Sequence, residues 1–260
     1  MNIFKQMAKS LYSPKDIAVF RFQGIGKTIL YIFFLTLISI LPASVFLGLT
    51  IGSSITAIQN TVNSSLPDFE IKDGTLTAQT DKPVEIKQGE IIIVLDPTGT
   101  YTAKEMEQKN NSVGILKNEF VLVSNGSPQV ISYTSAGNFT ITKAQIADFA
   151  KQTGQLKPVI IAAVLILLYL VSSFSKFIEV TILALLGLVI RNMLKKKVNF
   201  KQSWVMSAYA VTLATLFFTI MTSLQAAVPS QGLVQWFVHI VMLYLAVKEI
   251  PSKTEPAAIT

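Results

Sequence analysis

Three ionisable residues that interrupt apolar segments are the side chains best suited to chemistry. Lys176 and Glu179 are three residues apart within a long apolar run, and His239 is the single histidine of the sequence. Ionisable groups inside membrane segments are costly, and they usually serve as ion pairs, proton carriers or parts of a transport path. Because residues three apart share one helix face, we expect Lys176 and Glu179 to pair with each other, with a functional carboxylate as the alternative.

His239 belongs to a polar row on the last apolar segment. Gln231, Gln235 and His239 are spaced four residues apart, so a helix brings them to one face. A single imidazole is a poor metal site in a chain that has no cysteine. We therefore expect His239 to make a structural hydrogen bond across the helix bundle, with a proton-linked or ligand-sensing role as the alternative.

Two short strings resemble parts of catalytic loops without their full patterns. Gly24 to Thr28 reads GIGKT, but Arg21 stands where a phosphate-binding loop needs its first glycine. The segment IIIVLDPTGT (91–100) resembles the loop of aspartyl-phosphate enzymes, yet Pro97 replaces the lysine of those ATPases. A strand that ends in an aspartate turn explains this segment better. We predict no catalytic residue, no cofactor and no metal site, and hence a non-enzymatic protein.

The elements that must position these residues have the composition of a membrane protein. Apolar residues make up 51% of the chain and charged residues 14%, and the mean hydropathy is +0.52. Soluble domains carry about 25% charged residues. The predicted fold class is an α-helical integral membrane protein with about four transmembrane helices. The predicted spans are 28–52, 157–194, 203–225 and 232–248.

Between the first two spans, short β-prone runs alternate with turn residues. We predict an extracytoplasmic β-rich (α+β) domain over 53–156, ending in a helix from Lys143 to Thr153 with Thr142 as its N-cap. Strands are predicted at 69–72, 75–79, 84–87, 90–95, 119–124, 129–133 and 139–142. Turns are predicted at 73–74, 81–83, 96–99, 125–128 and 136–138.

The charges indicate how the chain is oriented. The segment 53–155 has eight lysines and eleven acidic residues, a net charge of −3, whereas the whole chain carries +7. The basic excess flanks the apolar segments, which the positive-inside rule assigns to the cytoplasm together with both termini. Nucleic-acid binding fits less well, because the folded domain is acidic. The basic residues predicted at the membrane surface are Lys5, Lys9, Lys15, Lys195, Lys196 and Lys197.

The leader and the second span leave two alternatives open. We expect 1–27 to be an amphipathic helix on the anionic inner leaflet, interrupted at Pro14, or else a plain basic flank that sets topology.

The second span contains a short apolar run, 180–190, which is only eleven residues long. The stretch 157–194 is therefore predicted as one long or kinked helix with a cytoplasmic or interfacial extension, and a crossing by 176–192 would give five helices. The remaining segments are a basic cytoplasmic loop (195–202), an outer turn (226–231) and a cytoplasmic tail (249–260).

The third span carries small and polar residues every three to four positions, which favours close helix packing. A transport path is the alternative reading of this stripe. Its members are Ala208, Thr212, Thr215, Thr219 and Thr222.

The layout is similar to that of a known family. A basic leader and first span precede the strings LPDFEIKDGTL (66–76), IIIVLDPTG (91–99) and TKAQI (142–146), and three apolar blocks follow. This order resembles an uncharacterised family of Firmicute membrane proteins, the domain of unknown function 1189, some of whose members are labelled maltodextrin utilisation proteins. The segment NFKQSWVMSAYAV (199–211) resembles Yip-type multi-pass proteins. The resemblance implies a Gram-positive plasma membrane and a sugar ABC importer as partner.

We therefore predict a membrane accessory protein whose outer domain and helices bind other membrane proteins and whose leader contacts the lipid bilayer. The alternative is a small transporter or lipid-handling protein, a class that usually shows internal repeats or buried charges at the midplane. A membrane enzyme is a third possibility, and it would need convergent acids, bases or metal ligands. The oligomeric state is left open.

Overall fold

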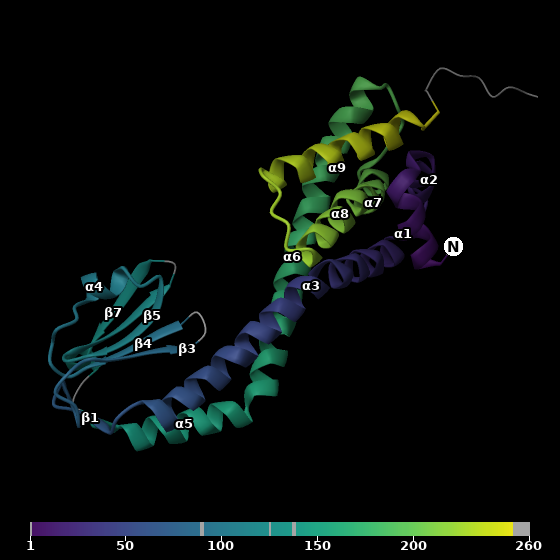
Figure 1. Ribbon diagram of the computed structural model, residues 1–260. Helices are drawn as coiled ribbons and strands as arrows, with labels where there is room; N and C mark the ends of the chain where they lie inside the picture. Colours follow the sequence, from purple (N-terminus) through teal and green to yellow (C-terminus); the bar gives the residue numbers. More distant parts are fainter. Residues whose placement is uncertain (1, 89–90, 125, 137–138, 252–260) are drawn as a thin grey trace, which may run out of the picture. The chain divides into compact units, whose positions relative to one another are not determined.

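The computed structural model describes residues 2–88, 91–124, 126–136 and 139–251 (Figure 1). The chain forms two compact units. The helical unit consists of Met1–Gly48 and Ala163–Thr260, and the β-rich unit is the intervening segment Leu49–Ala162. A β-sheet region thus lies between the first two long apolar helices, as predicted from the sequence.

Four helices in the described part of the chain are long and apolar enough to cross a membrane. They are α3 (Ile25–Asn60), α6 (Lys157–Met193), α7 (Phe200–Ala210) continued by α8 (Thr212–Ser223), and α9 (Gln231–Lys248). Since α6 is a single continuous helix, 176–192 is not a separate element.

Two of these helices differ from their predicted bounds by more than one residue. α3 runs past the predicted limit at 52 and continues through Pro42, which apolar spanning helices tolerate. The third span starts at Phe200 rather than 203 because Asn199 and Gln202 form a capping box. The Asn199 Oδ1 accepts from the Gln202 backbone N–H at 2.8 Å, and the Gln202 Oε1 accepts from the Asn199 N–H at 3.0 Å.

The leader forms helices interrupted at Pro14, as predicted, and it also packs on the helical unit, which was not predicted. α1 (Ile3–Tyr12) and α2 (Pro14–Phe20) are separated at Ser13, which caps α2 with Pro14 at its first position. Ile17 and Phe20 of α2 are buried in the same core as residues of α7 and α9. A helix lying only on the lipid surface would leave these side chains to the membrane. The leader is therefore part of the bundle.

The β-rich unit contains two sheets. The three-stranded sheet has the order β2 (Thr75–Ala78), β1 (Phe69–Lys72), β8 (Ile141–Thr142). The five-stranded sheet has the order β3 (Val84–Gln88), β4 (Ile91–Asp96), β5 (Asn111–Leu116), β6 (Glu119–Ser124), β7 (Ser127–Ser132). A core that includes Phe69, Leu76 and Leu95 joins residues of both sheets, and the short helix α4 (Ala103–Glu107) adds Met106 to a second core.

Strand β5 was not predicted. It pairs in parallel with β4, and α4 lies in the connection between them. Its sequence NSVGIL begins with turn-forming residues and contains Gly114, so its intrinsic strand preference is low. Pairing with β4 and β6, and burial of Leu116, fix it as a strand.

The other predicted elements of this unit are present with small shifts. The final helix, α5 (Lys143–Gln155), starts at the predicted N-cap, where Thr142 and Gln145 form a capping box. The Asp73–Gly74 turn joins β1 to β2 with positive φ at both residues, as a two-residue hairpin requires. Parts of the predicted strand 90–95, of the turns at 125–128 and 136–138, and of the tail 249–260 lie outside the described residues.

Candidate functional site

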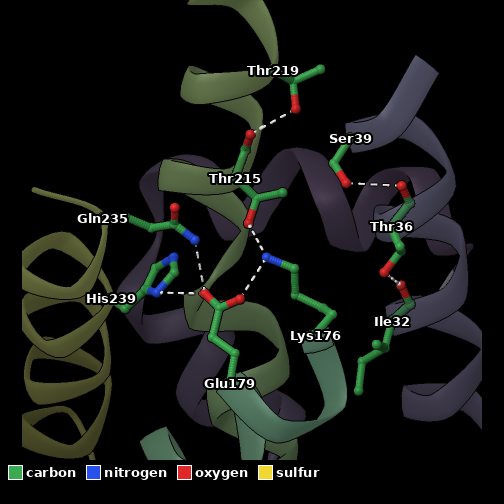
Figure 2. A network of polar contacts seen from close by, with 9 residues as sticks. All are labelled: Ile32, Thr36, Ser39, Lys176, Glu179, Thr215, Thr219, Gln235 and His239. Atoms are coloured by element: carbon green, nitrogen blue, oxygen red, sulfur yellow. Dashed lines mark hydrogen bonds and ion pairs between the residues drawn. The ribbon is translucent and has the colours of Figure 1, made fainter. Parts of the chain in front are cut away.

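A cluster of polar side chains lies inside the helical unit, where three helices meet (Figure 2). α6 contributes Lys176 and Glu179, α8 contributes Thr215, and α9 contributes Gln235 and His239. Each pair on one helix is spaced by three or four residues, so both side chains project from the same face. We call these five residues the ion cluster.

The Glu179 carboxylate is the centre of the ion cluster. Its Oε2 lies 2.8 Å from the Lys176 Nζ, so the predicted ion pair is present. Its Oε1 accepts a hydrogen bond from the Gln235 amide at 3.1 Å and lies 2.9 Å from the His239 Nδ1. One carboxylate thus contacts a lysine on its own helix and two side chains of α9, as a buried charge requires.

Lys176 connects the carboxylate to α8. Its Nζ donates to the Thr215 hydroxyl at 3.2 Å. The Thr215 backbone carbonyl accepts from the Thr219 hydroxyl at 2.7 Å, within the same helix. Lys176 and Glu179 remain 11% and 15% exposed, so the pair is only partly buried.

His239 is the most buried member of the ion cluster, with no exposed surface. Its Nδ1 is in ion-pair contact with Glu179, but the alignment falls short of a hydrogen bond. Its Nε2 has no hydrogen-bond partner among the described residues. The Trp236 ring lies beside the imidazole, with 6.2 Å between centroids and an angle of 69° between planes. A buried imidazole without a proper partner is energetically costly.

In the ion cluster, the opposite charges of Lys176 and Glu179 cancel, and the His239 imidazole lies beside this ion pair. This arrangement can hold three helices together, because its contacts connect α6 to α8 and α9. The described residues include no group of three histidine, cysteine, aspartate or glutamate side chains suited to a metal ion. Polar side chains of α3 stay separate, since Thr36 and Ser39 bond to carbonyls of their own helix (Figure 2).

The remaining predicted site residues have varied positions. Gln231 is exposed at the first residue of α9 and is not part of the ion cluster. In the predicted packing stripe, Ala208, Thr212 and Thr215 are buried. Thr222 is exposed, and its hydroxyl donates to the Phe218 carbonyl one turn earlier in α8. The extension of the packing stripe to Thr222 stays a prediction.

The predicted surface lysines also divide into two groups. Lys9 forms an ion pair with Asp16 at 2.5 Å, and Lys196 donates to the Ile250 carbonyl near the end of α9. Both therefore tie parts of the bundle together. The four that are exposed and fit a membrane-surface role are Lys5, Lys15, Lys195 and Lys197.

A second polar cluster was not predicted. Gln6 of α1 is buried and bonds to Gln23, whose amide donates to the Tyr209 hydroxyl at 2.5 Å. Tyr31 of α3 shares a hydrogen bond of 2.6 Å with the Thr212 hydroxyl. The only sequence signal was a glutamine among the apolar positions of the leader, and its partners are far away in the sequence.

Asp96, in the string that resembles a phosphoenzyme loop, has a structural role. The fully buried carboxylate accepts from the Thr98 hydroxyl at 2.6 Å and from backbone N–H groups of Thr98, Gly99 and Tyr101. Burial alone would raise the pKa of this carboxyl, but the four hydrogen bonds outweigh it and hold the pKa below its usual value. The loop thus satisfies its own aspartate.

The family described as a protein of unknown function (DUF1189) matches residues 4–247. No curated protein and no solved structure matches the chain.

Proposed function

The chain belongs to the DUF1189 family of proteins of unknown function, and we propose that it is a non-enzymatic membrane accessory protein that binds a second membrane protein. The observation that carries this proposal is the position of the β-rich unit in the sequence. It lies between α3 and α6, two helices long and apolar enough to cross a membrane. A domain anchored at both ends stays at the membrane surface, where it meets proteins of the same membrane.

In this proposal the β-rich unit faces the outside of a Gram-positive plasma membrane and both termini lie in the cytoplasm. The support is the distribution of charge. The basic residues of the leader and of the loop 195–202 flank the spans, whereas the segment 53–155 carries a net charge of −3. An acidic outer surface favours a partner with a basic patch, because opposite charges speed and orient association.

The contact surface we propose is the edge strand β7. Ile131 of β7 and Leu122 of the neighbouring strand β6 lie on one face of the sheet and are 55% and 40% exposed, and Val130, which is 47% exposed, lies on the opposite face of β7. Exposed apolar side chains on a sheet edge are typical of protein contacts. Pro128 in the same strand lacks a backbone N–H, which limits uncontrolled strand addition.

The partner class comes from the family resemblance. It implies a sugar ABC importer, of the kind that takes up maltodextrin, and envelope machinery is the other partner class. The Yip-type similarity of 199–211 supports a multi-pass helical domain but names no partner.

Affinity purification of the intact chain from its own membrane, in a mild detergent, tests the proposal. We expect an importer subunit or envelope protein to co-purify in stoichiometric amount, as identified by mass spectrometry. Ile131→Lys should reduce its recovery at least fivefold, because a charge on the contact surface must be desolvated. Thr77→Lys is the matched control, since it adds the same charge to an exposed position on another edge strand, β2. Equal recovery with both variants would remove β7 from the proposal.

A homo-oligomer without any second protein would contradict the accessory role and favour the second candidate. That candidate is a small transporter or lipid-handling protein, and the ion cluster is the observation behind it, because charges inside membrane helices often line a transport path. The flux of the transported solute or lipid across proteoliposome membranes should then be lost in His239→Ala and Glu179→Gln, although both variants are present in the same amount as the wild type. Unchanged flux in both variants would count against this candidate.

A further inference from the structure

We infer that α5 lies in the surface of the lipid bilayer and that Phe149 and Leu156 insert into it, so that the β-rich unit rests on the membrane. The inference rests on the membrane crossing by α6 that belongs to the proposed function, and it does not depend on a protein partner. It starts from two large apolar side chains that lie open. Phe149 of α5 is 71% exposed, and Leu156, which separates α5 from α6, is 55% exposed.

Another side of α5 is packed against the β-rich unit. Ala150 is buried, and Ile146 and Ala147 pack against the core that joins the two sheets. The Ala150 carbonyl also accepts a hydrogen bond from the Gln59 amide at 3.0 Å. Because α5 is fixed to the unit along this side, whatever binds its open side also holds the unit.

Phe149 and Leu156 form one apolar row along α5. They are seven residues apart, which is nearly two helical turns, so the two side chains lie within about 20° of each other around the helix axis. Each residue turns a helix by about 100°, so the exposed charged residues Asp148 and Lys151 lie away from this row. An apolar row on a helix that is charged elsewhere is typical of helices that lie in a membrane surface.

The row continues onto α6, and this continuity identifies its occupant as lipid. The Leu156 backbone is α-helical and its carbonyl accepts from the Ile160 N–H at 2.9 Å, so the helical turn runs through the junction. Val159, Ile166 and Leu170 follow at helical spacing on α6 and are 62%, 61% and 57% exposed. If α6 crosses the membrane, these side chains face lipid, and the residues just before them lie at the membrane surface. The chain bends where α5 passes into α6 (Figure 1), as a surface helix followed by a crossing helix requires.

The charge of the unit favours an apolar contact over an electrostatic one. The segment 53–155 carries a net charge of −3, so anionic headgroups do not attract it. Burial of the apolar row must therefore supply the binding. That contribution follows the apolar area removed from water, whereas salt screens only the interactions between charges.

Spin labels on single cysteines test the inference, because the chain has no cysteine of its own. The full-length variants Phe149→Cys and Leu156→Cys are labelled in nanodiscs of phosphatidylglycerol and phosphatidylethanolamine. Collisions of each label are measured with oxygen, which collects in the bilayer, and with a water-soluble nickel chelate. The ratio of oxygen to nickel collisions should be severalfold higher at both positions than at Thr77→Cys, an exposed position of β2.

Two further labels calibrate this ratio. Leu170→Cys on α6 gives the value for lipid. Lys151→Cys gives the value for the charged side of α5, and we expect it to match the value of Thr77→Cys.

A charge within the row should remove it from the lipid. Phe149→Glu, added to the protein labelled at Leu156→Cys, should lower the ratio of oxygen to nickel collisions severalfold, because a charged side chain is costly in the apolar part of the bilayer. Ala144→Glu is the matched control, since it adds the same charge to an exposed position seven residues before Lys151, on the charged side of α5. It should leave the ratio unchanged, as should added salt.

Ratios at Phe149→Cys and Leu156→Cys that match Thr77→Cys, with a lipid value at Leu170→Cys, would overturn the inference and leave the proposed membrane crossing intact. Few collisions with either reagent would mean that protein covers the row, and this result would also overturn the inference. A water-like ratio at Leu170→Cys would contradict the membrane crossing itself, and the inference with it.

Discussion

Each unit contains a carboxylate that is largely shielded from water, fully for Asp96 and partly for Glu179, and the two are satisfied in different ways. In the β-rich unit, the hydrogen bonds that the Asp96 carboxylate accepts from described residues come from the next five residues of its own loop. In the helical unit, Glu179 takes partners from α6 and α9, and His239 is left without a proper hydrogen bond. A locally satisfied charge is a fixed part of a fold. A charge shared between helices depends on how those helices are placed, so it can respond to their movement.

The largest effect should follow from removing the shared carboxylate. Glu179→Leu leaves Lys176 buried without its counter-ion, so we expect a loss of about 3–5 kcal/mol, measured by thermal unfolding of the purified chain in nanodiscs. The double variant Lys176→Met, Glu179→Leu should recover most of this loss, because an apolar pair of similar volume needs no partner. Glu107→Gln, at an exposed position of the β-rich unit, is the control. A double variant as unstable as the single one would show that the loss does not come from an unpaired charge.

A smaller and local effect is expected in the β-rich unit. Asp96→Ala leaves backbone N–H groups of the loop without an acceptor and should cost about 1–3 kcal/mol. Hydrogen exchange of the β4 and β5 amides in the full-length protein measures this loss without unfolding the helices. Faster exchange throughout the helical unit would mean that the two carboxylates are coupled.

The same aspartate gives a pH dependence of known sign. Because the folded pKa of Asp96 lies below its usual value, its stabilising effect is fully present above the unfolded pKa of about 3.9. That effect is lost as the pH falls through the lower, folded pKa. The exchange rates of wild type and Asp96→Ala should therefore converge in strong acid, and a constant difference down to pH 2 would contradict this linkage.

The last comparison concerns two glycines, Gly187 and Gly154, at which an added methyl group would meet a close neighbour. A Cβ on Gly187 would lie 2.2 Å from the Oγ of Ser203, which is buried and bonded to the Ala184 carbonyl. Gly187→Ala should cost about 1–3 kcal/mol, since the core has no room for the methyl group.

In the β-rich unit, a Cβ on Gly154 would meet the Nε2 of Gln59, the end of a flexible and partly exposed side chain. Gly154→Ala should therefore cost about 1 kcal/mol or less, because the flexible Gln59 side chain can move aside and the helix gains propensity, which partly offsets the loss of the Gln59 hydrogen bond to the Ala150 carbonyl. Thermal unfolding of both variants measures the contrast. Adding Ser203→Gly to Gly187→Ala should recover the lost stability, because it removes the side chain that the new methyl group would meet. Equal losses at the two glycines would mean that side-chain flexibility does not decide the cost.

Much of the fold could be predicted because its signals are local. Apolar length places the long helices, Asp73 and Gly74 form the hairpin turn, and Thr142 caps the helix after the sheet. Strand β5 escaped prediction because its place depends on neighbours, and its own residues do not favour a strand. The packing of the leader escaped prediction for the same reason, since its buried face is covered by helices that come about 200 residues later.

The candidate site shows the same division. The sequence by itself determined that Lys176 and Glu179 pair, because three residues of helix bring them together, and that His239 lies in an apolar segment. Only the tertiary structure decided that Gln235 and His239 meet that pair and that Gln231 does not. Helical periodicity fixes which side chains share a face, whereas packing between helices far apart in the chain decides what that face touches.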